Sequence, residues 1–129
     1  MAKKVLIVDD EPNIVMALDY LLQRNGYEVR IATNGDEALH QVEGFGPDLV
    51  LLDLMIPGKS GYDVCQRIRE HPTLGRIRIV MLSARGREAE VSKGLSLGAD
   101  LYITKPFSNV ELVTRIGELL GVACSPGKA

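Results

Sequence analysis

Five short strand-like runs, each followed by an amphipathic segment, constrain the fold more than any other feature of this sequence. The runs at residues 4–9, 47–55 and 76–84 are almost continuously apolar, as strands covered on both faces would be. Those at 27–32 and 100–104 are shorter or more polar. Strict alternation of strand and helix predicts parallel strands joined by right-handed crossovers, which is the α/β class.

The segments after these runs carry apolar residues at helical spacing. In residues 11–25 the apolar positions follow the i, i+3, i+4, i+7, i+8 pattern, Pro12 suits the first turn, and Gly26 suits the C-terminal stop. The last segment, 108–121, opens with a Ser-x-x-Glu capping box. The other three helices are predicted at 34–43, 58–71 and 87–98.

Strand polarity predicts the order of the sheet. The three most apolar strands belong in the centre, and the strands at 27–32 and 100–104 belong at the edges. The order 2-1-3-4-5 satisfies this requirement, with helices on both faces in a three-layer sandwich. A ligand site is then expected beyond the C-terminal strand ends, at the switch point between the first and third strands.

Polar residues collect at that predicted edge. Asp9 and Asp10 end the first strand, Asp53 the third and Ser83 the fourth, and Lys105 follows the fifth. Each of these residues alone would be an ordinary cap, turn or surface residue, but together they indicate metal-assisted phosphoryl transfer. Carboxylate oxygens suit Mg²⁺, an aspartate can act as a nucleophile, and an ammonium and a hydroxyl can stabilise a transferring phosphoryl group.

Bulk composition excludes several classes. The 129 residues suit one domain, and 15 basic against 17 acidic residues do not favour nucleic-acid binding. No segment approaches the ~20 apolar residues of a membrane span. Cys65 and Cys124 have no metal-ligand spacing, and no secretion signal is present, so we expect a reduced, cytoplasmic protein. Residues 122–129 are expected to form a flexible tail or the start of a linker.

Four motifs carry a resemblance to a known family: "VLIVDDEPN", "PDLVLLDLMIPGKSGYDV", "IVMLSAR" and "GADLYITKPFS". On these, residues 1–121 are identified as a receiver domain of bacterial two-component response regulators, the match running over 4–121. The resemblance implies a flavodoxin-like (βα)5 fold and a phosphorylation-activated switch. It also implies a sensor histidine kinase or phosphotransfer protein as donor, and a downstream effector protein or a fused effector domain as output. Enzymatic activity is expected only toward the chain's own phosphorylation and dephosphorylation.

The resemblance assigns the metal and acceptor roles. Asp53 is similar to the phosphoacceptor, and Asp9 and Asp10 to the acidic pair that holds Mg²⁺ (or Mn²⁺), with the carbonyl of Met55 as a further ligand. Met55 and Arg85 stand where side chains tune the aspartyl-phosphate lifetime. Because both are large enough to hinder an attacking water, a lifetime of minutes or longer is expected.

The resemblance also assigns the switch residues. Ser83 would donate to a phosphoryl oxygen, Ala84 would keep space beside it, and Lys105 would pair with another phosphoryl oxygen. A cis bond is expected before Pro106, and Tyr102 is similar to the aromatic that turns inward when Ser83 moves.

The predicted output face is formed by the fourth helix, fifth strand and fifth helix. Glu111 and Arg115 fit the charged pattern of family members that dimerise there, but Val91 and Leu101 stand at the expected partner positions. We therefore expect a monomer, or a weak dimer on phosphorylation.

Three other readings remain open at this stage. A flavin binder would need a phosphate loop where "DDEPN" places acids. A small-molecule phosphatase would need an Asp-x-Asp spacing on the first strand, which Asp9-Asp10-Glu11 does not match. A receiver-shaped module that binds partners without being phosphorylated is the main alternative. His40 and His71 are expected to be solvated, not phosphodonors.

Overall fold

The computed structural model describes residues 3–54, 56, 60–71, 76–83, 88–105 and 107–121, with residues 88–90 described by their backbone only. In chain order the elements are β1 (Lys4–Val8), α1 (Pro12–Arg24), β2 (Glu28–Ala32), α2 (Gly35–Phe45), β3 (Leu49–Asp53), α3 (Gly61–Glu70), β4 (Arg78–Ser83), α4 (Glu88–Ser96), β5 (Leu101–Thr104) and α5 (Asn109–Leu120).

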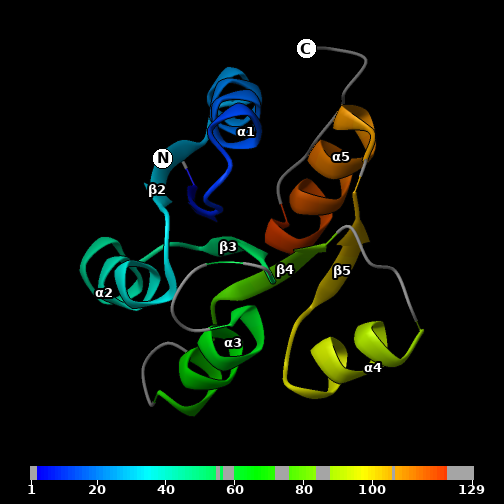
Figure 1. Ribbon diagram of the computed structural model, residues 1–129. Coiled ribbons are helices and arrows are strands. Elements are labelled where there is room, and N and C mark those ends of the chain that lie inside the picture. Colours follow the sequence, from blue (N-terminus) through cyan, green and yellow to red (C-terminus); the bar gives the residue numbers. More distant parts are fainter. Residues whose placement is uncertain are drawn as a thin grey trace.

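The strands form one parallel sheet in the order β2-β1-β3-β4-β5, as predicted. Val8 pairs with Leu52, and Ser83 with Thr104, so the C-terminal ends of these strands share one edge. Helices α1 and α5 cover one face of the sheet, and α2, α3 and α4 cover the other (Figure 1). The three-layer sandwich expected from the alternation of strand and helix is confirmed.

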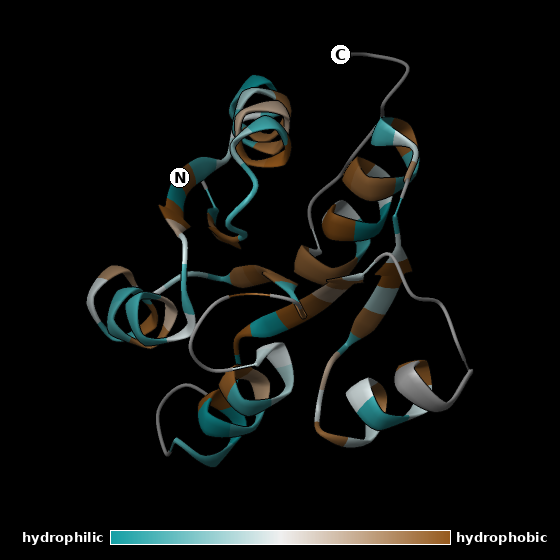
Figure 2. Cartoon of the chain, viewed as in Figure 1, coloured by the Kyte–Doolittle hydropathy of each residue, from teal (hydrophilic) through white to brown (hydrophobic). Residues whose placement is uncertain are grey.

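Each face of the sheet has its own apolar core. Successive residues of a strand point to opposite faces, so Ile7 and Leu51 pack with α1 and α5, whereas Leu6 and Val50 pack with the helices opposite. Figure 2 shows the hydrophobic colour concentrated on the strands and on the helix faces turned toward them. Two covered faces explain why the central strands read as unbroken apolar runs.

Caps set the helix boundaries. Helix α3 begins at Gly61, three residues later than predicted, because the Asp63 N–H donates to Ser60 Oγ at 3.3 Å and makes Ser60 the N-cap. The predicted cap of α5 is present, with the Glu111 N–H donating to Ser108 Oγ at 3.4 Å. Helix α2 runs two residues further than predicted, to Phe45. None of the helices in the described ranges has the length and apolarity that crossing a bilayer requires.

Candidate functional site

Three carboxylates meet at the C-terminal edge of the sheet. Asp9 and Asp10 are the first two residues after β1, and Asp53 is the last residue of the neighbouring strand β3. One carboxylate oxygen from each lies within 4.8 Å of the others. Asp9 is 0% and Asp53 5% exposed, whereas Asp10 faces solvent. The predicted convergence of these three residues is therefore present.

Lys105 lies between the two buried carboxylates. Its Nζ is 3.2 Å from Asp9 Oδ2 and 3.5 Å from Asp53 Oδ2, and its side chain is only 14% exposed. The Lys105 N–H donates to the carbonyl of Ser83 at 2.7 Å, which fixes the start of its loop against the end of β4. Among the residues that the structure describes, three carboxylates thus face one ammonium, an excess of negative charge that a cation would offset.

Backbone contacts hold the Asp9 carboxylate in place. The Asp9 N–H donates to the carbonyl of Ala32 at 3.1 Å, which extends the β1–β2 pairing by one residue. The Glu11 N–H donates to Asp9 Oδ1 at 2.9 Å. Because Oδ1 accepts this bond and Oδ2 contacts Lys105, both oxygens of the buried carboxylate are compensated.

Gly61 packs closely against the end of β3, and the sequence-based reasoning assigned it no role. A Cβ at this position would lie 2.8 Å from Leu54 Cα and 2.9 Å from the carbonyl oxygen of Asp53. Backbone atoms cannot move aside as a flexible side chain can, so only glycine fits here. The glycine of the "KSG" stretch, four residues before Cys65, was the available signal for this close approach.

The predicted switch residues lie along β4 and β5. Ser83 is 2% exposed at the end of β4. Tyr102 is half-buried and packs against the core beneath α4. A Cβ on Gly94 of α4 would lie 2.7 Å from Met81 Sδ and 3.4 Å from Tyr102 Cδ2, so the helix rests directly on the ring. Tyr102 and α4 are therefore in close packing contact.

Some predicted residues lie outside the described residues. These are Met55, Ala84, Arg85, Pro106 and the tail at 122–129.

The donor set suits a hard divalent cation. Asp9, Asp10 and Asp53 offer oxygen ligands only, which Mg²⁺ and Mn²⁺ prefer over softer donors. Mg²⁺ keeps several water ligands when it binds proteins, and the exposed carboxylate of Asp10 gives such waters access. The residues present therefore fit the cation implied by the resemblance.

A family model for the response regulator receiver domain matches residues 5–117. The chain belongs to this family. Receiver domains are the phosphorylated switches of two-component systems, so the flavin-binding, small-molecule phosphatase and non-phosphorylated readings are not favoured.

Two curated relatives of this receiver domain are transcriptional regulatory proteins. The chain is 43% identical to the phosphate regulon transcriptional regulatory protein PhoB of Rhizobium meliloti, over 93% of this chain and 53% of the relative. It is 45% identical to the alkaline phosphatase synthesis transcriptional regulatory protein PhoP of Bacillus subtilis, over 93% of this chain and 49% of the relative. The chain spans about half the length of these curated relatives.

Solved structures of receiver domains share the fold. A putative response regulator from Chloroflexus aurantiacus superposes with a TM-score of 0.89 at 39% identity, covering 94% of this chain and 99% of that one. The receiver domain of a sensor histidine kinase from Pseudomonas aeruginosa superposes with a TM-score of 0.86 at 26% identity, covering 94% and 99%. That structure has a magnesium ion coordinated in its active-site cleft.

Proposed function

We propose that Asp53 is the phosphoacceptor of this receiver domain and that Lys105, Ser83 and the Asp9–Asp10 pair serve it. The observation that carries this assignment is the position of Lys105, whose Nζ contacts Asp53 and Asp9 together. Asp53 ends a central strand at the open edge of the sheet, where an incoming phosphoryl group can reach it.

The reaction needs only groups that this edge brings together. An oxygen of Asp53 forms a bond to phosphorus while the bond from phosphorus to the donor breaks. For a phosphohistidine donor, the imidazole nitrogen leaves with the bonding electron pair and takes a proton from water. The ammonium of Lys105 and the hydroxyl of Ser83 stabilise the negative charge on the phosphoryl oxygens. The chain catalyses its own phosphorylation and dephosphorylation only.

Asp9, Asp10 and Asp53 would hold the cation, with the Met55 carbonyl as the predicted further ligand. Bound Mg²⁺, or Mn²⁺, would neutralise charge on the transferring phosphoryl group. Asp9 keeps its orientation through the Glu11 N–H, so the ligand set is partly preorganised. The exposed Asp10 carboxylate is the member able to adjust its position.

Phosphorylation would change the contacts of Lys105 first. The phosphoryl oxygens compete for the ammonium that now contacts Asp53 and Asp9, and for the hydroxyl of Ser83. Movement at the end of β4 would pass to Tyr102, which lies one strand away and beneath α4. The face formed by α4, β5 and α5 would then shift toward its active arrangement.

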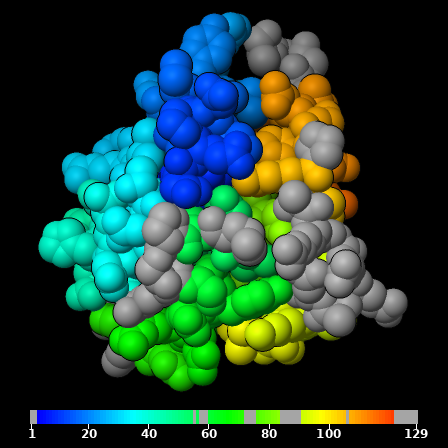
Figure 3. Space-filling view, viewed as in Figure 1, coloured from blue at the N-terminus to red at the C-terminus, as the bar shows by residue number. Residues whose placement is uncertain are grey.

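A kinase docking site is the hollow of about 450 Å³ between α1 and the segment that leads into α5. It is lined by Asn13, Ile14, Ala17, Leu18, Lys105, Phe107 and Asn109. The surfaces of α1 (blue) and α5 (orange) meet on the face shown in Figure 3. An amphipathic helix of a sensor kinase or phosphotransfer protein would lie in this groove beside Lys105 and present its histidine to Asp53.

The α4–β5–α5 face supports at most weak self-association. Glu111 and Arg115 are exposed on α5, whereas Val91 and Leu101 are half-buried and carry no charge to pair with them. Light scattering with and without a phosphoryl mimic should give a monomer that dimerises weakly on activation. A tight dimer of the unphosphorylated protein would contradict this assignment.

The proposal is tested by intact mass after incubation with acetyl phosphate. We expect one added phosphoryl group in the presence of Mg²⁺, and none with EDTA or in Asp53→Asn. Addition to Asp53→Asn, or to wild type without a metal, would overturn the assignment. After removal of the donor, the adduct should decay over minutes or longer, and decay within seconds would contradict the lifetime prediction for Met55 and Arg85.

Ala17→Glu separates docking from chemistry. Ala17 is exposed and lies in the groove, away from the carboxylates. The substitution should slow phosphoryl transfer from a sensor kinase and leave the reaction with acetyl phosphate unchanged. Equal rates with the kinase would show that the donor docks elsewhere.

A further inference from the structure

A second charged hollow lies at the N-terminal edge of the sheet, opposite the carboxylates. It has a volume of about 460 Å³ and is lined by Arg69, Arg76, Ile77, Arg78, Gly98 and Asp100. From Arg78 to Ser83, β4 spans the sheet, which at ~3.3 Å per residue is about 17 Å. A ligand in this hollow would therefore not touch the phosphoacceptor edge.

Arg69 and Asp100 form hydrogen bonds with each other and with backbone groups. Arg69 donates to Asp100 Oδ2 at 2.8 Å and to the carbonyls of Gly98 and Ile77 at 2.8 and 2.5 Å. Asp100 Oδ2 also accepts from the Ile79 N–H at 2.8 Å. Asp100 is the one acidic residue among the described residues that line the hollow, and Arg69, whose side chain is 21% exposed, matches its charge.

Arg76 and Arg78 remain as an excess of positive charge. The guanidinium of Arg78 makes one long contact within the described residues, to Asp100 Oδ1 at 3.4 Å, and the side chain is 51% exposed. Arg76 is exposed and has no hydrogen bond or ion pair to any residue that the structure describes. Two guanidinium groups thus lie near each other on the rim of a hollow in a chain whose net charge is −2.

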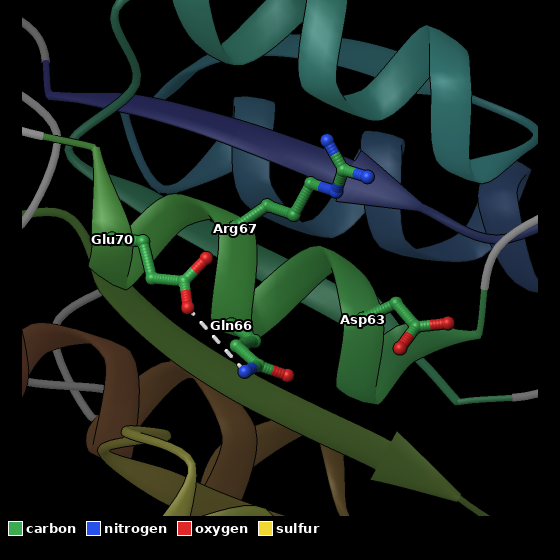
Figure 4. Close-up of a pocket in the computed structure, with 4 residues that line it drawn as sticks. All are labelled: Asp63, Gln66, Arg67 and Glu70. Carbon is green, nitrogen blue, oxygen red and sulfur yellow. Dashed lines mark hydrogen bonds between the residues drawn. The ribbon is translucent and has the colours of Figure 1, made fainter.

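The hollow on the outer face of α3 provides a contrast. It is lined by Asp63, Gln66, Arg67 and Glu70, so its carboxylates outnumber its cation. In Figure 4, Gln66 donates to Glu70, at 3.4 Å, and Arg67 lies on the same helix. Positive excess is therefore a property of the Arg76–Arg78 hollow and not of this side of the molecule as a whole.

We propose that the Arg76–Arg78 hollow binds an acidic peptide segment of a partner protein. Guanidinium groups bind carboxylates through paired N–H donors, and two of them on one rim suit neighbouring Asp or Glu side chains. Inside the hollow, the carbonyls of Gly98 and Ile77 accept hydrogen bonds from Arg69, and carbonyl oxygens offer nothing that an anion can bind. A buried phosphate would need N–H donors there, whereas a peptide carboxylate reaches the rim alone.

The test is a titration of the full chain with a capped hexaglutamate peptide in EDTA, followed by amide chemical shifts. We expect saturable shifts at Ile77, Arg78 and Gly98 that weaken as salt is added. Arg76→Ala combined with Arg78→Ala should reduce the affinity about tenfold. Arg67→Ala removes one charge from the neighbouring helix face and should change the affinity less than about twofold.

Three outcomes would overturn the proposal. The first is the absence of saturable chemical-shift changes in the wild-type protein. The second is a loss of peptide affinity in Arg67→Ala as large as in the Arg76→Ala, Arg78→Ala double variant. The third is unchanged peptide affinity in the double variant. Inorganic phosphate at matched ionic strength distinguishes the ligand class, because equal shifts at the same amides would identify a general anion site. The measurement needs neither a metal nor phosphorylation, so its result is independent of the role of Asp53.

Discussion

The two edges of the sheet each hold a long-range ion-pair network, but the two networks differ in how completely their charges are matched. At the N-terminal edge, Arg69 and Asp100 join α3 to the start of β5, and every carboxylate oxygen of Asp100 has a protein donor. At the C-terminal edge, Lys105 is the one described cation in contact with Asp9 and Asp53, and Asp10 adds a further negative charge.

This difference separates a structural network from a functional one. The Arg69–Asp100 pair contributes rigidity and needs no ligand of its own, because its polar groups are already satisfied, and the positive excess of that edge lies outside the pair, on Arg76 and Arg78. An unmatched network stores repulsion, about 1 kcal/mol for two unit charges 4 Å apart in water and more where the carboxylates are buried. A divalent cation relieves that repulsion, so the mismatch becomes affinity for the metal.

The largest effect is expected from breaking the unmatched edge. Asp10→Asn should weaken Mg²⁺ binding by at least about tenfold and slow phosphorylation by acetyl phosphate in parallel. Calorimetric titration measures the Mg²⁺ affinity, and intact mass over time measures the rate of phosphorylation. Glu11→Gln is the control, because Glu11 contributes its N–H and not its carboxylate to the cluster. Equal losses in both variants would mean that net charge, not ligation, attracts the cation.

Breaking the matched edge should cost stability instead. Arg69→Ala is expected to lower the free energy of unfolding by about 2–3 kcal/mol, since it removes the ion-pair partner of Asp100 and the side-chain donor to the carbonyls of Gly98 and Ile77. Arg67→Ala, on the same helix but exposed, should change it by less than about 0.5 kcal/mol. Urea unfolding of Arg69→Ala and Arg67→Ala measures both free energies. Similar midpoints for the two variants would remove the distinction between the edges.

Cys65 allows the matched edge to be probed by pH. Its Sγ lies 3.6 Å from the carbonyl oxygen of Leu97. Burial raises the pKa of the thiol from an ordinary value of 9.0 to about 11. Arg69 lowers this pKa and Asp100 raises it, both by smaller amounts. Because the raised pKa disfavours the thiolate in the folded state, the protein should lose stability as the pH rises from 9 toward 11.

At pH 10 this loss should be about 1 kcal/mol relative to pH 8, and Cys65→Ala should not show it. Urea unfolding of wild type and Cys65→Ala should be measured at both pH values. Lysine and tyrosine titrate in both proteins, so the difference between the proteins reports the thiol. Parallel losses in the two proteins would show that the thiol ionises as readily in the folded state as in the unfolded state.

The smallest effect is a gain. In EDTA, Asp10→Asn should raise the free energy of unfolding by a few tenths of a kcal/mol, because it removes a like charge from beside Asp9 and Asp53. Asp100→Asn should lower it, since the matched edge loses the charge that Arg69 pairs with. A gain in Asp10→Asn together with a loss in Asp100→Asn would support the difference between the two edges, and a loss in both variants would contradict it.

Much of the fold could be predicted because it follows from local chemistry. Continuous apolar runs require strands with two covered faces, and the alternation with helices leaves few topologies. The differences between predicted and observed elements lie at helix boundaries, where a single capping side chain decides at which residue the helix begins. Ser60 caps α3 and delays its start to Gly61, a choice that the run "GKSG" leaves open because Ser60 and Gly58 are both plausible breakers.

The site was predictable to the level of which residues converge. Asp9, Asp10 and Asp53 could be placed at one edge because parallel strands end together. Gly61 was not recognised, because the glycine of "KSG" marks a break in the chain but does not show that the backbone of Leu54 and Asp53 approaches it. The roles of Met55, Ala84, Arg85 and Pro106 stay predictions.

The sequence by itself determined the class of fold, the order of the strands and the set of chemical groups at the ligand edge, because hydrophobic periodicity acts over neighbouring residues. Only the tertiary structure decided how those groups pair. Lys105 reaches Asp9 across 96 positions in the chain, and Arg69 reaches Asp100 across 31. Such contacts depend on loop paths and side-chain reach, which no local pattern encodes. They match the charges of Arg69 and Asp100, and among the described residues they leave the Asp9–Asp10–Asp53 cluster with a negative excess that suits a metal ion.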